Sequence, residues 1–433
     1  MDDKTFNPVR AQLMRLDAVD LRAVLMPVFK RASGNHSDER VITYSNESGP
    51  ALSIEYRPHK NGKRDPLGEV SKIRAEAHLT IEDIRNLEGQ VRIVLGPQDT
   101  LVVAQYHFAY LPVKGWWRYR DRFQILPPHP EAPTPRFFAA DHPYILEAAY
   151  TAPNHHNVIA NRRTQTLTEL RRILPVLLRG PVFQPQAERN TKHWVMPMDA
   201  QQARRRRRER QSHLSGNPPR QRTRPVVAVQ AGKPIFAQEH YRAPNYSSTG
   251  QFSDTDGMPP LAAVDAQSYS SGSVAVTDVL TVPTGLAELL DTYFALSLVD
   301  KRRYLRACYW HNMGQFLHSY SASLSLFSDV AAIEVMLPDE GGPHTCSECG
   351  FPHYPSITKS FKEFLTKFVP ARPERDAFYQ LRSEVAHGSA LFSIDLREEF
   401  GGFYPIENEQ ILQRNLLHQV CKTALVNWLA SRG

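Results

Sequence analysis

Apolar residues recur at helical spacing through the last third of the chain. Phe361, Phe364, Leu365 and Phe368 fall on one helical face, a spacing typical of an amphipathic helix. Similar patterns predict helices over residues 286–298, 301–320, 321–337, 358–369, 373–387 and 408–430. Four or five long helices fit an all-α, up-and-down bundle over residues 285–433.

The first part of the chain carries β-branched and aromatic runs bounded by turn residues. These runs predict strands over residues 51–56, 91–95 and 100–110. Two helices are also expected: a short one over residues 80–87 capped by Thr80, and a longer one over residues 166–178 bent at Pro175. We therefore expect a mixed, strand-rich α/β domain over residues 1–199.

Residues 200–284 are rich in Arg, Gln, Ser, Pro and Gly and contain few segments able to bury a core. This composition predicts a basic, flexible linker. The expected fold class is therefore α+β, with a strand-rich N-terminal domain, a linker and a C-terminal helical bundle.

Positive charge is in excess along the chain and partly concentrated in the linker. The 433 residues carry a net charge of +7, and the pI is about 9.1. Such a balance favours polyanionic partners such as RNA, DNA or anionic lipid, although a solvated basic linker explains it equally well. The local excess in the linker is a run of five consecutive arginines: Arg204, Arg205, Arg206, Arg207 and Arg208.

Aromatic and basic residues alternate in a second segment, where Trp117, Arg118 and Arg120 are candidate RNA-binding residues. Aromatic rings can stack on bases while arginines hold phosphates. The same segment can equally be a strand with its aromatics toward a core and its arginines toward water, and the sequence leaves both readings open.

Cysteine usage and hydropathy bear on the compartment. The chain has only four cysteines, too few for a disulfide scaffold of this size, so we expect a reducing environment. The N-terminus lacks the apolar stretch of a signal peptide, and no run of 18 apolar residues is present. We expect a cytoplasmic protein without a membrane partner.

Two cysteines form a Cys-x2-Cys pair that is flanked by histidines. The four potential zinc ligands are His344, Cys346, Cys349 and His353. They can form a structural zinc site, or the segment can be a reduced loop without metal. His155 and His156 have no matching ligands nearby and are interpreted as part of a loop.

The helix predicted over residues 373–387 ends in a distinctive pair. Arg382 precedes His387 by five residues, and Gly388 suits the left-handed position after a helix end. A guanidinium holds phosphate oxygens, and an imidazole moves protons near neutral pH. The pair therefore suits chemistry on a phosphodiester, although spacing alone also fits a core helix with a surface ion pair.

The segment from Leu381 to Gly388 resembles the Arg-x4-6-His motif of the HEPN superfamily, in the form seen in bacterial defence proteins. Residues 330–337 are similar to the second helix of this family, where Glu334 stands at the position of an acid close to the Arg/His pair. The Cys-x2-Cys segment and the apolar helix after it match an insertion common in this branch. The resemblance covers about the last 150 residues.

The resemblance implies a metal-independent endoribonuclease in which His387 is the general base or acid and Arg382 binds the scissile phosphate. Supporting positions are Tyr379, Ser383, Glu384 and Glu334. It further implies a homodimer through the bundle, RNA targets such as tRNA or mRNA, and a toxin-like role in antiphage defence under a phage-derived trigger. The domain over residues 1–199 would then have a sensor or regulatory role. The alternative is a catalytically inactive HEPN module for dimerisation or nucleic-acid binding.

Overall fold

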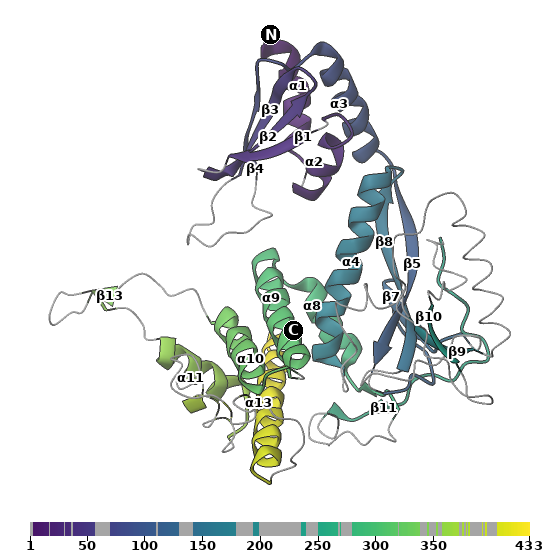
Figure 1. Ribbon diagram of the computed structural model, residues 1–433, viewed down its shortest axis with the longest axis vertical. Coiled ribbons are helices and arrows are strands. Elements are labelled where there is room, and N and C mark those ends of the chain that lie inside the picture. Colours follow the sequence, from purple (N-terminus) through teal and green to yellow (C-terminus); the bar gives the residue numbers. More distant parts are fainter. Residues whose placement is uncertain are drawn as a thin grey trace. The chain divides into compact units, whose positions relative to one another are not determined.

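The computed structural model describes residues 3–16, 18–29, 31–35, 38–56, 70–109, 111–129, 142–178, 194–198, 235–239, 250–266, 269, 279–318, 320–337, 344–345, 352–353, 357–371, 375, 378, 380–381, 392, 395 and 405–433. These residues form an α+β arrangement, with helices and antiparallel sheets followed by a C-terminal helical cluster (Figure 1). This confirms the expected fold class.

The chain divides into two compact units. The first comprises Met1–Ala104, Glu147–Thr168 and Ser247–Ser253, and the second comprises Gln105–Leu146, Glu169–Tyr246 and Asp254–Gly433. Both units combine segments that are distant in the sequence.

The first unit contains a four-stranded antiparallel sheet in the order β1-β2-β3-β4. Its strands are β1 (Arg31–Asn35), β2 (Asp38–Asn46), β3 (Gly49–Tyr56) and β4 (Val70–Ala75). Helices α1 (Asp3–Leu13), α2 (Ala18–Leu25) and α3 (Ile81–Val94) accompany it. The strand predicted over residues 51–56 is thus confirmed as part of β3.

Helix α3 corrects one sequence prediction. Thr80 caps it in a capping box, in which the Thr80 side chain accepts from the Asp83 backbone and the Asp83 side chain accepts from the Thr80 backbone. The helix then continues through residues 91–94, which the sequence predicted as a strand. Its buried residues are Ile84, Leu87, Val91 and Val94. The β-branched residues therefore belong to the apolar stripe of a helix, and helical packing outweighs their strand propensity.

A second sheet has the order β5-β8-β7-β6. Its strands are β5 (Gln98–Ala109), β6 (Trp117–Tyr119), β7 (Phe123–Leu126) and β8 (His142–Pro153). Strand β5 confirms the prediction over residues 100–110. The boundaries of the two units fall within β5, β8 and the helix that follows β8.

That helix, α4 (His156–Leu177), begins ten residues before the predicted residue 166. His156 therefore opens a helix, which corrects its interpretation as loop. His155 stands just before the helix; its ring bonds Gln90 at 2.6 Å and accepts a weak bond from the Val158 backbone. Burial lowers the pKa of His155, so the ring favours its neutral form.

Helix α4 continues past Pro175 because other groups take up the carbonyls near it. A proline has no N–H for the carbonyl four residues earlier, which here belongs to Arg171. The Asn312 side chain donates to the carbonyls of Arg171 (3.4 Å) and Arg172 (3.0 Å). Lys422 donates to the Pro175 carbonyl at 3.3 Å.

Part of the stretch predicted as linker is held by the second unit. Strand β11 (Ala263–Val264) pairs in parallel with β12 (Val282–Pro283). Trp116 donates its backbone N–H to Pro259 at 3.0 Å and accepts from Leu261 at 2.8 Å. A Cβ on Gly115 would lie 2.6 Å from the Pro259 carbonyl, so the two backbones approach closely because Gly115 has no side chain. A further antiparallel pair joins β9 (Trp194–Met198) and β10 (Ile235–Glu239).

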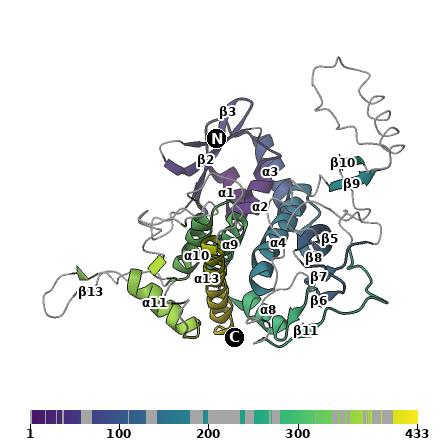
Figure 2. The same cartoon turned by 60° about the horizontal axis from the view of Figure 1, so that its bottom comes forward.

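The C-terminal helices follow the sequence prediction within a few residues. They are α8 (Leu286–Ala295), α9 (Leu298–Leu317), α10 (Ala322–Met336), α11 (Ile357–Phe368) and α13 (Pro405–Ala430). Ser297 and Ser321 accept the N-cap bonds of α9 and α10. Helices α9, α10 and α13 lie side by side in both views (Figure 1, Figure 2). Within the described part of the chain, no helix combines the length and apolar character needed to cross a membrane.

Candidate functional site

The residues of the Arg/His motif lie outside the described residues. These are Arg382 and His387, together with Tyr379, Ser383 and Glu384. The described residues just before the motif, at positions 375, 378, 380 and 381, are helical. Phe378 is fully buried and packs edge-on against Phe361 of α11, with ring centroids 5.8 Å apart. Through this contact the residues just before the motif pack on the apolar face of α11.

Glu334, the remaining supporting candidate, lies in the last part of α10 and is half-buried.

The segment with alternating aromatics and arginines lies against α8. Tyr119 is buried, stacks on Phe294 at 5.6 Å between ring centroids, and donates its hydroxyl to Asp291 at 2.6 Å. Arg120 forms an ion pair with the same carboxylate at 2.5 Å. Arg118 donates to Gln124 at 2.7 Å, and Trp117 stacks on Tyr119. These three candidate RNA-binding side chains therefore all make contacts within the protein. The run Arg204–Arg208 lies outside the described residues.

Two of the four candidate zinc ligands fall in a short antiparallel pair. Strands β13 (His344–Thr345) and β14 (Pro352–His353) place His344 and His353 opposite each other as backbone partners. Cys346 and Cys349 lie outside the described residues.

The largest group of buried polar side chains in the helical cluster was not singled out by the sequence. His311 of α9, Asp329 of α10 and His418 of α13 meet between their helices. His311 Nδ1 lies 2.9 Å from Asp329 Oδ1, and His418 Nδ1 lies 2.9 Å from Asp329 Oδ2. The two imidazoles stack in parallel, with ring centroids 4.0 Å apart and an interplanar angle of 10°. We call these three residues the His–Asp–His cluster.

A second polar layer lies one helical turn away, at Gly314, Ser325 and Arg414. Arg414 is only 3% exposed; its Nε donates to Ser325 Oγ at 2.7 Å and its Nη2 donates to the Gly314 carbonyl at 2.8 Å. Ser325 donates to the same carbonyl. A Cβ on Gly314 would lie 2.9 Å from the Ser325 carbonyl and 3.1 Å from Asp329 Oδ1. Gly314 is therefore the position where α9 and α10 approach most closely among the residues of this centre.

The electrostatics of the cluster favour a charged Asp329 and a neutral His418. Burial lowers the pKa of His418 to about 3; Asp329 opposes this shift, while His311 and Arg414 add to it. Burial alone would raise the pKa of Asp329, but electrostatic attraction to the two imidazoles and their hydrogen bonds to the carboxylate hold it below its usual range. The negative charge of Asp329 thus lies one helical turn from the positive charge of Arg414.

The donor atoms of the cluster are of the type that binds zinc, and they lie within 4.8 Å of one another. The structure nevertheless accounts for them without an ion, because each Nδ1 already lies at hydrogen-bond distance from the carboxylate. A divalent ion would also add two positive charges to a buried centre that already holds the Arg414 guanidinium. We therefore interpret the cluster as a hydrogen-bonded structural centre of the helices.

Sequence reasoning missed this centre because its members come from three separate helices. Asp329 was the one available signal, since it interrupts an otherwise apolar helix next to the buried residues Val330 and Ile333. A buried carboxylate requires partners, but the sequence does not say which residues supply them.

Comparison with known proteins gave no match, whether to protein-family models, to curated proteins or to solved structures.

Proposed function

We propose that the protein is a metal-independent endoribonuclease of the HEPN type. The observation that carries the proposal is the motif Leu381-Arg382-Ser-Glu-Val-Ala-His387-Gly388 in the C-terminal helical region. Two structural features support it. The described helices of this region form a cluster as the family resemblance requires, and the residues immediately before Arg382 are helical and anchored through Phe378.

In the proposed reaction His387 removes the proton from a ribose 2′-hydroxyl. The 2′-oxygen then attacks the phosphorus, the bond to the 5′-oxygen breaks, and a protonated imidazole returns a proton to that leaving oxygen. Arg382 binds the phosphate and stabilises the negative charge that develops on it. Tyr379, Ser383, Glu384 and Glu334 orient these two groups or the RNA.

One imidazole cannot act as base and acid in the same step, so the proposal includes a homodimer in which the motifs of two bundles face each other. The RNA is a tRNA or mRNA, and the reaction acts as a toxin against an infected cell under a phage-derived trigger, in the cytoplasm. The run Arg204–Arg208 adds non-specific attraction for the RNA backbone. His344, Cys346, Cys349 and His353 hold a structural zinc that takes no part in the reaction.

The test compares wild type with His387→Ala and Arg382→Lys in purified form and in growing cells. Cleavage of total RNA and the arrest of growth should disappear in His387→Ala. Arg382→Lys should be severely impaired, because lysine keeps the charge but loses the planar fork that binds two phosphate oxygens. Circular dichroism of each variant checks that the fold is retained.

Full activity of His387→Ala would exclude the nuclease mechanism. RNA binding without cleavage by wild type would instead favour the catalytically inactive HEPN module. Light scattering at the assay concentration tests the dimer separately, because a monomer that still cleaves RNA contradicts the shared site.

A further inference from the structure

Helix α11 has two sharply different faces. Phe361, Phe364, Leu365 and Phe368 are buried. The exposed positions are Lys359, Lys362, Glu363, Thr366 and Lys367. At about 100° per residue these exposed positions lie within an arc of about 140°, opposite the buried stripe. The helix therefore presents a polar face opposite its buried stripe, and on this face Lys367 Nζ lies 5.2 Å from the centroid of the Phe368 ring.

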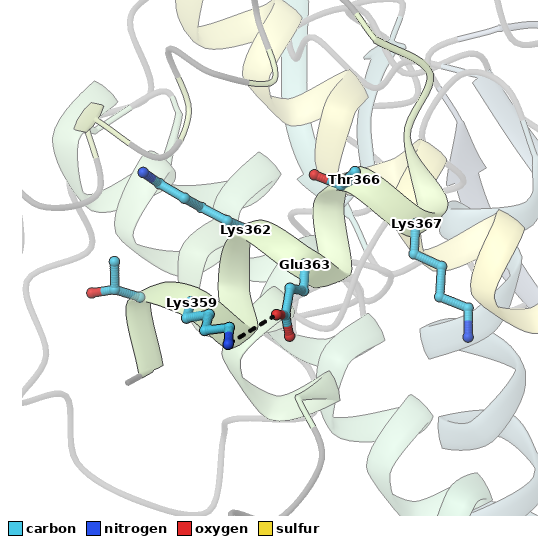
Figure 3. A pocket seen from close by; sticks show the side chains of 6 residues that line it. Lys359, Lys362, Glu363, Thr366 and Lys367 are labelled. Carbon is cyan, nitrogen blue, oxygen red and sulfur yellow. Dashed lines mark ion pairs between the residues drawn. The ribbon is translucent and has the colours of Figure 1, made fainter. Parts of the chain in front are cut away.

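The exposed face carries three lysines and one glutamate, so its net charge is positive. It borders an open depression of about 500 Å³, which the described residues Thr358, Lys359, Lys362, Glu363, Thr366 and Lys367 line. Lys362 and Lys367 extend in different directions from the helix, with Lys359 and Glu363 between them (Figure 3). We call these three lysines the lysine face.

The one ion pair between the labelled residues holds its lysine only weakly. Lys359 Nζ lies 3.9 Å from Glu363 Oε1, and the two side chains are 76% and 65% exposed. Exposed pairs of this kind contribute about 0–1 kcal/mol. Lys359 can therefore exchange Glu363 for a phosphate at little cost.

The opposite side of the same helix leads to the motif. Phe361 on the buried stripe contacts Phe378, and Arg382 follows Phe378 by four residues in the sequence. Helix α11 is thus a described element that directly contacts the residues just before the motif. A long anionic substrate held at Arg382 extends beyond the cleaved bond, and its neighbouring phosphates need cations close by.

We propose that the lysine face of α11 binds the phosphate backbone of the RNA substrate away from the scissile bond. This inference rests on the proposed nuclease function and adds to it a binding surface for flanking nucleotides. Lysine suits the role, since it binds a phosphate as a flexible point charge and makes no bidentate or base-specific contact. The surface therefore contributes affinity without sequence preference.

The test uses the full chain and a fluorescent single-stranded RNA with 2′-O-methyl riboses, which cannot be cleaved by attack of the 2′-oxygen. The variant is Lys359→Gln/Lys362→Gln/Lys367→Gln, and binding is measured at several salt concentrations. Loss of three phosphate contacts should reduce the slope of log K against log salt by about 2, since each contact on a single strand contributes about 0.7. Affinity at low salt should fall at least about tenfold.

Two matched controls separate this surface from total charge. Glu363→Gln removes the one acid of the face and should tighten binding. Lys72→Gln/Arg85→Gln/Arg92→Gln changes the net charge by the same amount as the lysine variant, at exposed positions on β4 and α3, and should leave the salt slope near that of wild type.

The outcomes distinguish this inference from the function on which it rests. If wild type cleaves ordinary RNA and the lysine variant binds with an unchanged slope, the lysine face is only a solvated surface and the nuclease stands. If wild type neither binds nor cleaves RNA, both fail. Binding of wild type to phosphatidylserine vesicles that the lysine variant loses, with RNA binding unchanged, assigns the surface to lipid and overturns the inference.

Discussion

Replacing His418 by asparagine should remove a defined part of the acid sensitivity of the helical cluster. Asparagine places an amide N–H near the position of Nδ1, so it can still donate to Asp329. It cannot take up a proton. The substitution therefore keeps the hydrogen bond to the carboxylate and removes the titration.

The expected magnitude comes from the pKa of His418, which falls from its ordinary value of 6.5 to about 3 in the folded protein. Because the folded state holds the proton less tightly, the unfolded chain is protonated first as the pH falls. The stability that depends on neutral His418 is complete above about pH 6.5 and declines toward pH 3. At pH 5 the loss amounts to about 2 kcal/mol relative to pH 8.

The groups that face His418 support this direction. Asp329 of α10 favours protonation, but it is shared with His311 of α9, and Arg414 of α13 adds a positive charge close by. The pKa of Asp329 lies below its usual range, so this carboxylate loses its charge only under more acidic conditions. Measurements between pH 8 and pH 5 therefore isolate the imidazole.

The assay is urea unfolding at pH 8 and pH 5, followed by hydrogen exchange in peptides from α13, which report on the helical cluster. Compared with His418→Asn, wild type should lose about 2 kcal/mol more of its unfolding free energy when the pH falls from 8 to 5. An equal pH dependence of wild type and His418→Asn would refute the buried neutral imidazole.

Three further substitutions test the packing described above. Gly314→Ala should destabilise the protein by about 1–3 kcal/mol in urea unfolding, because its Cβ meets the Ser325 carbonyl. The control Gly89→Ala, on the open face of α3, should stabilise the protein by about 0.5–1 kcal/mol. Equal effects of the two substitutions would contradict the close approach of α9 and α10. Arg414→Lys should cost at least about 2 kcal/mol through lost charged hydrogen bonds, and unchanged stability would show that charge alone suffices. Thr80→Ala should cost about 1 kcal/mol and speed hydrogen exchange in the first turn of α3, unless the capping box is dispensable.

Local patterns in the sequence determined the helices of the C-terminal region. The spacing of apolar residues placed α9 and α10 within a few residues of their observed bounds, and the structure adds the N-cap serines Ser297 and Ser321. These signals succeed because a helix is stabilised by residues three and four positions apart, which the sequence displays directly. The sequence alone also provides the motif from Arg382 to His387, on which the proposed function depends.

Tertiary structure decided the features that depend on contacts between distant segments. Residues 91–94 became the end of α3 because Val91 and Val94 continue a buried helical stripe, although their side chains favour strands. Arg120 forms an ion pair with Asp291 of α8. The alternation of aromatic and basic residues along its own segment did not predict this partner.

The polar centre shows the same limit most clearly. His311 and Asp329 stood on predicted helices without any sign that they would meet each other and His418. The sequence by itself determined the helices α9, α10 and α13, since a helix depends on neighbours along the chain. Only the packing of α9 against α10 and α13 decided that a carboxylate, two imidazoles and a guanidinium would be buried together, because a buried charge persists only where other elements bring it partners.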